Sequence, residues 1–241
     1  MIKDGEHVVL IGNDREYFVQ AGKGNLSTDL GVINLSSLIG TNAGDKVASH
    51  LGHEFSIYFP RSTDFFTHAS RSGAPMLPKD IGLIIGFTGM NHRDEVLDAG
   101  TGSGIAAIYF GGIALHVTSF EKRPDFVKIA QDNVKAAKLD NVEVMEGDVL
   151  FAKGMFDVVH LDMAIGGIHI EHAYRVLQPG GYLACYTPFL EQTFTVVDAA
   201  SSLFRNVNTY ECIARELTRS SRGTRPSTRL CHSGYITIAR R

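Results

Sequence analysis

The 241-residue chain lacks several features that would assign it to a particular compartment or scaffold. It has no apolar run of membrane-spanning length, and its first residues do not show the basic-then-apolar order of a secretory signal. We therefore expect a cytoplasmic protein with no membrane partner. Its cysteines are odd in number and show no Cys-x-x-Cys spacing, which argues against a zinc site or a complete disulfide framework. Buried thiols are the favoured interpretation of Cys185, Cys212 and Cys231.

The chain also lacks the overall positive charge that a nucleic-acid-binding protein often has. Its formal net charge is −3, but residues 205–241 hold eight arginines and no lysine against two glutamates, a local balance of +6 that leaves −9 elsewhere. Five of these arginines lie in one polar stretch. They are Arg215, Arg219, Arg222, Arg225 and Arg229. The stretch is either a solvated loop or a phosphate-contacting segment, because arginine suits bidentate recognition of phosphate, and composition alone leaves both interpretations open.

The first part of the chain has the pattern of a small antiparallel β-domain. Short β-type runs alternate with turn residues, and we expect strands at 7–12, 15–20, 31–35, 46–51 and 54–59. Residues 60–78 are expected to form a mixed connector. The length allows one core plus a small appended domain, so we predict an N-terminal β-domain at 1–65 and a larger domain at 66–241.

The second part alternates apolar strands with helical patterns, which predicts an α/β fold with a doubly wound, mostly parallel sheet. Expected strands are 95–100, 116–121, 142–148, 156–162 and 181–188, and expected helices are 124–139 and 166–177. At the C-terminus, residues 209–217 and 233–241 are expected to form an antiparallel hairpin at the sheet edge, joined by the arginine-rich loop.

The first of these strands leads into a glycine-rich turn, Val96 to Gly104, with the sequence VLDAGTGSG. A dinucleotide-binding fold would need a third glycine at position 105, which is Ile105. The Asp-x-Gly-x-Gly-x-Gly spacing suits a cofactor that needs close backbone approach and neighbouring acids rather than a pyrophosphate. Such acids follow: Glu121 closes the next expected strand, where it can accept from both ribose hydroxyls.

Asp148 closes the third expected strand, where it can accept from an adenine amino group while Val149 packs against the ring. Acids near a cationic sulfonium are favourable, whereas near a pyrophosphate they would repel. The sequence therefore predicts S-adenosylmethionine as the cofactor.

These features resemble the class I methyltransferases, and specifically the tRNA adenosine-58 N1 methyltransferases of archaea and bacteria. Four further stretches carry this match over nearly the whole chain: Gly22 to Gly40, the MLPKD run at 76–80 before the first helix, Phe120 to Val134, and His232 to Arg241. One departure is Leu77, which stands where the family usually has tyrosine.

The resemblance implies the residues of the site. The implied cofactor-binding residues are Leu77, Gly100, Thr101, Gly102, Ser103, Gly104, Ile105, Glu121, Lys122, Asp148, Val149 and Asp162. The implied substrate residues are Pro78, Arg219, Arg222, Arg225 and His232, with tRNA as the partner and a homotetramer as the assembly. No metal is expected.

Asp162 follows the fourth expected strand and is the candidate catalytic residue. Ring nitrogen-1 of adenine attacks without prior deprotonation, but the product ring is cationic, and a carboxylate stabilises that developing charge. The alternative is that Asp162 caps a helix starting near Ala164. The strand end has no proline of the kind found in exocyclic amino methyltransferases, and Cys185 has no second cysteine nearby to suggest cytosine-5 chemistry.

Two other functions remain open from the sequence. One is a small-molecule methyltransferase of the precorrin-decarboxylating type, which shares the glycine turn but lacks such an N-terminal domain. The other is a non-catalytic tRNA-binding subunit, although the glycine turn and Asp162 are both intact. The sequence does not say whether adenosine 57 is also modified.

Overall fold

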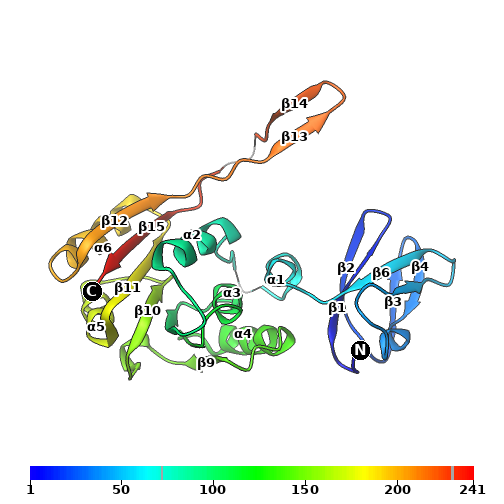
Figure 1. Cartoon of the computed structure of the whole chain (residues 1–241), viewed down its shortest axis with the longest axis horizontal. Helices are drawn as coiled ribbons and strands as arrows, with labels where there is room; N and C mark the ends of the chain where they lie inside the picture. Colours follow the sequence, from blue (N-terminus) through cyan, green and yellow to red (C-terminus); the bar gives the residue numbers. More distant parts are fainter. Residues whose placement is uncertain (72, 229–230) are drawn as a thin grey trace. The chain divides into compact units, whose positions relative to one another are not determined.

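The structure is a computed structural model that describes residues 1–71, 73–228 and 231–241 (Figure 1). Contacts divide the chain into two compact units. The first comprises Met1–Ser70 with Lys135–Lys138, and the second comprises Arg71–Val134 with Leu139–Arg241. Among the described residues, none of the helices combines the length and apolar character needed to span a bilayer.

The first unit contains a four-stranded antiparallel sheet of order β2-β1-β6-β5 and a separate β3-β4 pair. Asn13 and Asp14 both adopt positive φ angles, 51° and 58°, between the paired residues Gly12 and Arg15, which is the geometry of a tight two-residue hairpin turn. The predicted antiparallel domain is confirmed, although β3 was not expected. Its strands are β1 (His7–Gly12), β2 (Arg15–Gln20), β3 (Asn25–Thr28), β4 (Gly31–Asn34), β5 (Lys46–Ala48) and β6 (Glu54–Tyr58), with a 3-10 helix η1 (Leu35–Leu38) after β4.

The connector at 60–78 was expected to be mixed in character, and the sequence did not predict a particular helix in it. Helix α1 (Ser62–His68) occupies its first half. The backbone N–H of Arg61 donates to the Asp64 carboxylate at 2.6 Å, which satisfies the free end of the helix. Phe65 packs edge-on against Phe18 of β2, with ring centroids 5.3 Å apart, so α1 belongs to the first unit.

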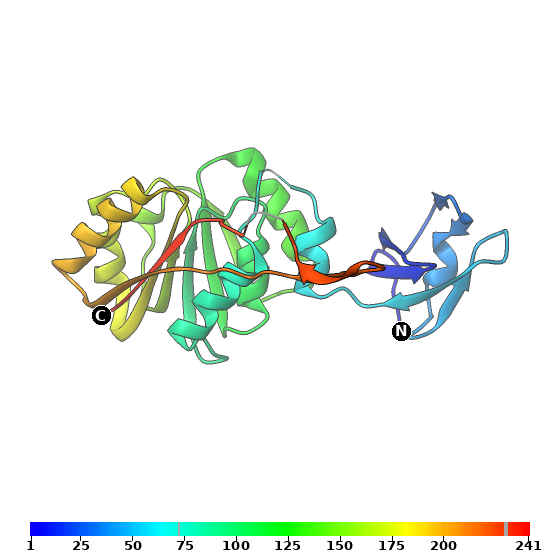
Figure 2. The same ribbon diagram turned by 90° about the horizontal axis from the view of Figure 1, so that it is seen from above.

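The second unit is built on a seven-stranded sheet of order β12-β15-β11-β10-β7-β8-β9 (Figures 1 and 2). Strands β11, β10, β7, β8 and β9 run parallel, and β15 is antiparallel to both β11 and β12. The predicted fold class is confirmed. The strands are β7 (Glu95–Ala99), β8 (His116–Glu121), β9 (Val142–Glu146), β10 (Phe156–Leu161), β11 (Leu177–Thr187), β12 (Arg205–Glu211) and β15 (Tyr235–Arg240).

Helices flank this sheet and bury an apolar core against it. Leu97, Val159 and Leu183, on β7, β10 and β11, lie in one buried cluster with Ile170 and Val196 of two flanking helices. Helix α6 was not expected from the sequence. The helices are α2 (Pro78–Thr88), α3 (Ile105–Gly111), α4 (Pro124–Ala136), α5 (Gly167–Val176) and α6 (Leu190–Ser201), with a 3-10 helix η2 (Val149–Phe151).

The third parallel strand ends earlier than the sequence suggested. β9 stops at Glu146, so Asp148 lies beyond it and caps η2, where its carboxylate accepts from the backbone N–H of Leu150 at 3.0 Å. The helix predicted after the MLPKD run already begins within it, at Pro78, whose fixed φ suits a first helical turn.

The C-terminal region also differs from the expectation. β12 begins at Arg205 and ends at Glu211, rather than covering 209–217, and it pairs with β15 as expected. The residues between them were predicted to form a plain loop, but they contain a second antiparallel hairpin of strands β13 (Leu217–Ser220) and β14 (Gly223–Pro226). Every residue of these two strands is exposed.

Candidate active site

The glycine turn between β7 and α3 is shaped by close contact with its neighbours. Gly100, Gly102 and Gly104 have φ angles of 86°, 56° and 83°, a region that other residues rarely adopt. A Cβ on Gly100 would lie 1.9 Å from the carbonyl oxygen of Asp162, and one on Gly104 would lie 3.2 Å from the side chain of Ala130. Two of the three glycines therefore let the turn pack against the end of β10 and against α4.

A chain of buried hydrogen bonds supports the turn from below. The Thr101 hydroxyl bonds to the Ser119 hydroxyl at 2.6 Å, Ser119 donates to Asp98, and the other oxygen of Asp98 lies 2.6 Å from Nδ1 of His160. All four side chains are buried. Asp98, the acid within the glycine-rich stretch, ties the ends of β7, β8 and β10 together and is not in the described lining of either cavity that meets at the glycine turn.

Two cavities meet at the glycine turn. The larger, of about 460 Å³, lies at the ends of β7 and β8, and the smaller, of about 250 Å³, lies between the turn and the residues before α2. Gly100, Arg123 and Asp162 line both. The larger is also lined by Ala99, Phe120, Glu121, Lys122, Gly147, Val149, Met163 and Ala164, and the smaller by Gly73, Ala74, Pro75, Met76, Thr101, Gly102, Ser103, Ile105, Ala106 and Phe126.

Glu121 is a buried, hydrogen-bonded acid in the lining of the larger cavity. It is 4% exposed, and its carboxylate accepts from the backbone N–H groups of Gly102 and Arg123 and from the Arg123 guanidinium, at 3.0–3.2 Å. Burial raises the pKa of this carboxyl, but these hydrogen bonds outweigh burial and bring the pKa below its usual value. Glu121 is therefore an ionised acceptor.

Arg123 was missed from the sequence, although its position two residues after a strand-end acid was a usable signal. Its guanidinium stacks over the ring of Phe126, 3.5 Å from the ring centroid, while it bonds to Glu121. Its side chain is more than half exposed, so it can move away from the carboxylate without disturbing the core.

Asp148 and Lys122 form an ion pair at the mouth of this region, with 2.8 Å between Nζ and Oδ2. The hydrogen bond from Lys122 lowers the pKa of Asp148. Of the described residues around the larger cavity, Lys122 and the buried Val149 are in its lining, whereas Asp148 stands just outside it.

Asp162 directly follows β10, and its backbone N–H donates to the carbonyl of Ala99 at 2.8 Å. Helix α5 begins at Gly167 with Gly166 as its N-cap, so the alternative of Asp162 as a helix cap is wrong. Burial raises the pKa of the Asp162 carboxyl to about 6, an effect that the nearby Asp98 increases and His160 opposes. A carboxylate so placed readily pairs with a cation in either cavity.

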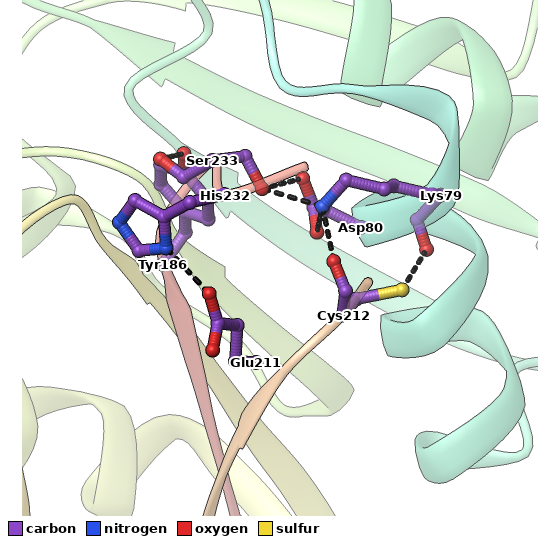
Figure 3. Close-up of polar contacts among 7 residues, drawn as sticks. All are labelled: Lys79, Asp80, Tyr186, Glu211, Cys212, His232 and Ser233. Carbon is purple, nitrogen blue, oxygen red and sulfur yellow. Dashed lines mark hydrogen bonds and ion pairs between the residues drawn. The ribbon is translucent and has the colours of Figure 1, made fainter. Parts of the chain in front are cut away.

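The residues just before α2 form a wall of the smaller cavity. Met76 lines the smaller cavity, whereas the predicted cofactor residue Leu77 is 38% exposed and is not in the described lining of either cavity. Pro78 is the first residue of α2. The next two residues, Lys79 and Asp80, belong to a polar cluster that joins α2 to the C-terminal strands (Figure 3).

Tyr186, near the end of β11, is a second residue that sequence reasoning missed, although it is an aromatic at a strand end of the parallel sheet. Its hydroxyl donates to the backbone carbonyl of Ser233 at 2.6 Å (Figure 3). Burial raises the pKa of the phenol to about 12, and the charges of Asp80 and Asp162 add to the shift. The predicted residue His232 is more exposed, and its Nδ1 lies 2.7 Å from the Glu211 carboxylate.

The described arginines of the C-terminal segment lie on the exposed hairpin. Arg219 is opposite Thr224, and Arg225 is opposite Thr218 in the neighbouring pair, so the two arginines point to opposite faces of the hairpin. Arg222 lies in the turn. Arg229, also part of the predicted basic stretch, lies outside the described residues.

The three cysteines differ in burial. Cys185 is fully buried in β11, and burial raises the pKa of its thiol, but Cys212 and Cys231 are only partly buried, so the expectation of three buried thiols was wrong for two. Within the part of the chain that the structure describes, no three His, Cys, Asp or Glu side chains gather as metal ligands.

The sheet order, the glycine turn and the acids beside it define a class I methyltransferase fold. A family model described as "Methyltransferase domain" matches residues 97–185. The chain is 30% identical to the tRNA (adenine(57)-N(1)/adenine(58)-N(1))-methyltransferase TrmI of Methanocaldococcus jannaschii, over 94% of this chain and 91% of the relative. The chain therefore belongs to the TrmI family of S-adenosylmethionine-dependent methyltransferases.

Two solved structures extend the likeness to the full length. The crystal structure of the tRNA (m1A58) methyltransferase TrmI of Aquifex aeolicus matches with a TM-score of 0.81 and 25% identity, over 99% of this chain and 98% of that one. A Thermotoga maritima protein titled a SAM-dependent O-methyltransferase matches with a TM-score of 0.88 and 25% identity, over 100% and 94%. Both matches therefore include the N-terminal unit.

Proposed function

We propose that this protein transfers a methyl group from S-adenosylmethionine to ring nitrogen-1 of adenosine 58 in the T-loop of tRNA, with adenosine 57 as a second candidate position. The observation that carries the proposal is the position of Asp162, a carboxylate at the junction of the two cavities, in a chain of the TrmI family. An enzyme of this kind must hold a nucleophile in line with the sulfonium methyl in a pocket that excludes water.

The larger cavity fits the nucleoside part of the cofactor. The Gly100 to Gly104 turn leaves room where side chains would intrude, and Glu121 supplies an ionised acceptor for ribose hydroxyls. Val149 packs against the adenine ring, with Lys122 and Asp148 at its polar edge. Bound S-adenosylmethionine supplies the electrophilic methyl group, and Asp162 faces its positive charge.

Arg123 has a defined part in cofactor binding. The Gly102 and Arg123 backbone N–H groups and two guanidinium N–H groups already bond to the Glu121 carboxylate. A carboxylate has about four lone-pair sites, so ribose hydroxyls bind Glu121 only when the Arg123 side chain moves away. The backbone bonds from Gly102 and Arg123 still hold the carboxylate in place.

The target adenine lies on the other side of Asp162, in the region of Pro78, Tyr186 and His232. Its ring nitrogen-1 has a free lone pair, so no base is needed before attack. Asp162 stabilises the positive charge that develops on the ring as the methyl moves, and it can accept from the 6-amino group. In folded tRNA this base is extruded from its stack to reach the pocket.

The arginine-bearing hairpin supplies the contact with the rest of the tRNA. Arg219, Arg222 and Arg225 are exposed guanidinium groups suited to bidentate bonds with phosphate. We also propose that the protein acts as a homotetramer, and that each chain has an N-terminal domain of residues 1–65 and a catalytic domain of residues 66–241.

A methylation assay tests the proposal. Purified protein is incubated with methyl-labelled S-adenosylmethionine and a T-loop-containing tRNA transcript, and the product is digested to nucleosides. We expect label in 1-methyladenosine, and its loss when position 58 is changed to guanosine; a matched change at position 57 shows whether that site is also used. Binding of tRNA without methyl transfer, or transfer to another nucleoside, contradicts the proposal. Light scattering of the purified protein after size-exclusion chromatography tests whether the assembly contains four copies of the chain.

A further inference from the structure

The arginine-bearing hairpin has almost nothing of its own to hold it in position. All residues of β13 and β14 are exposed, so the hairpin packs no apolar face against the sheet. An isolated two-stranded hairpin is at best marginally stable in water. The segment that carries the hairpin leaves the sheet after β12, next to Cys212, and returns to it before β15, next to Ser233.

One side chain bonds to both of these points. The Lys79 ammonium donates to the backbone carbonyl of Cys212 at 2.5 Å and to the hydroxyl of Ser233 at 2.6 Å (Figure 3). It also pairs with Asp80 at 2.8 Å, and the Ser233 hydroxyl donates to the second oxygen of Asp80 at 2.7 Å. Cys212 and Ser233, which are 133 and 154 positions away from Lys79 in the sequence, are thus both held at the start of α2.

Burial makes the loss of any partner in this cluster costly. The Asp80 side chain is 0% exposed and that of Lys79 is 14% exposed, so an unpaired charge at either position carries a large desolvation penalty. The three N–H donors of Lys79 have three acceptors, and both oxygens of Asp80 accept a hydrogen bond. A fully satisfied, partly buried network of this kind favours one arrangement of its members.

The same cluster is continuous with the pocket. Met76, which lines the smaller cavity, lies three residues before Lys79. The Tyr186 hydroxyl bonds to the carbonyl of Ser233, and the charges of Asp80 and Asp162 both act on that phenol. The ends of the segment therefore lie next to the region proposed for the target base.

We propose that Lys79, Asp80 and Ser233 are positioning residues that fix both ends of residues 212–233 against the first turn of α2. This tether presents the tRNA bound by the hairpin to the pocket in one geometry. The inference rests on the proposed function for its RNA part, but the tether itself is a property of the protein alone.

The test uses Ser233→Ala, which removes the hydroxyl shared by Lys79 and Asp80. We expect faster amide hydrogen exchange in residues 213–228 and about a tenfold higher KM for tRNA. Affinity for S-adenosylmethionine and the rate at saturating tRNA should remain within about twofold. Ser233→Thr keeps the hydroxyl and should behave as wild type.

Thr209→Val is the matched control. It removes the hydroxyl pair between Thr209 and Thr237, 2.9 Å apart on the same strands β12 and β15, without touching Lys79. It should leave the exchange of residues 213–228 unchanged. Wild-type exchange and KM in Ser233→Ala overturn the proposal, as does a fall in melting temperature and cofactor affinity that matches the fall in tRNA affinity, since this indicates a general loss of stability. The exchange measurement needs no tRNA, so it remains decisive if the proposed substrate is wrong.

Discussion

The cofactor pocket and the arginine-bearing hairpin belong to the same unit of the protein but are built in opposite ways. The pocket stands on buried strands, and its turn is held by the hydrogen-bond chain from Thr101 to His160 and by backbone contacts of Gly100. The two strands of the hairpin consist entirely of exposed residues. Methyl transfer needs atoms placed to a fraction of an ångström, whereas phosphate recognition by long side chains does not.

The comparison implies that changes in the pocket act through the stability and shape of the core, while changes in the hairpin act through charge and leave the core intact. The effects of equivalent substitutions in the two regions should therefore differ in magnitude and in the property that changes.

The largest difference is expected between two glycine substitutions. Gly100→Ala places a Cβ 1.9 Å from the carbonyl oxygen of Asp162, whereas a Cβ on Gly223 of the hairpin meets no atom within 4 Å. Both glycines have positive φ angles. We expect Gly100→Ala to lower the free energy of unfolding by more than about 4 kcal/mol, or to prevent folding, and Gly223→Ala to lower it by less than about 1 kcal/mol. Urea unfolding measures both, and similar losses would refute the comparison.

The next effect is on cofactor affinity. Glu121→Ala removes the buried acceptor proposed for the ribose hydroxyls, at a cost of about 1.5 to 3 kcal/mol in binding free energy. Glu146→Ala, at the exposed end of β9, is the control and should bind normally. Calorimetry with S-adenosylmethionine measures both, and an unchanged affinity in Glu121→Ala removes this residue from the cofactor site.

The raised pKa of Asp162 predicts a pH dependence. Only the ionised carboxylate stabilises the developing positive charge, so the single-turnover rate should fall about tenfold per pH unit below about 6. Bound sulfonium favours the ionised form and moves the inflection to lower pH. Asp162→Asn should lack the inflection; if it retains the wild-type profile, another group titrates.

The raised pKa of Asp162 also makes stability depend on pH, and here the ionised form is the unfavourable one. The folded protein holds the Asp162 proton more tightly than the unfolded chain, so the contribution to stability is present below a pH of about 4 and is lost as the pH rises through about 6. Relative to wild type, Asp162→Asn should therefore be more stabilising at pH 8 than at pH 4. Urea unfolding at both values measures this difference.

The smallest effect is expected from the hairpin. Replacing Arg219 and Arg225 with glutamine should lower tRNA affinity about fivefold at low salt and flatten the plot of log affinity against log salt by about 1 to 2 units. Cofactor affinity and unfolding should not change. A wild-type salt slope in the double variant leaves this hairpin as a solvated surface without a role in RNA binding.

The strongly periodic parts of the fold could be predicted from the sequence. The alternating strands and helices of the parallel sheet, and the tight turn at Asn13 and Asp14, have local signals that the tertiary structure does not override. Helix α1 was missed because its stability comes from Phe65 packing on a strand distant in sequence. The β13-β14 hairpin was missed because its strands are polar and bury nothing.

The placement of Glu121, Asp162 and the glycine turn at the cavities was predictable, because each lies at or directly after the end of a parallel strand. The site was not predictable where tertiary contacts decide the direction of a side chain. Asp98 faces inward to His160, Leu77 remains outside the cavity lining while Met76 enters it, and Arg123 shares the carboxylate of Glu121. The polar cluster of Lys79 and Ser233 joins residues far apart in sequence.

The most direct test of the central claim is to measure single-turnover methylation and equilibrium tRNA binding on the same preparation of Asp162→Ala. The account predicts that methylation slows about 100-fold or more, because Asp162 meets a charge that exists only as the methyl moves, while tRNA binding stays nearly intact. Methylation near the wild-type rate would contradict the account, since Asp162 would then have no catalytic role.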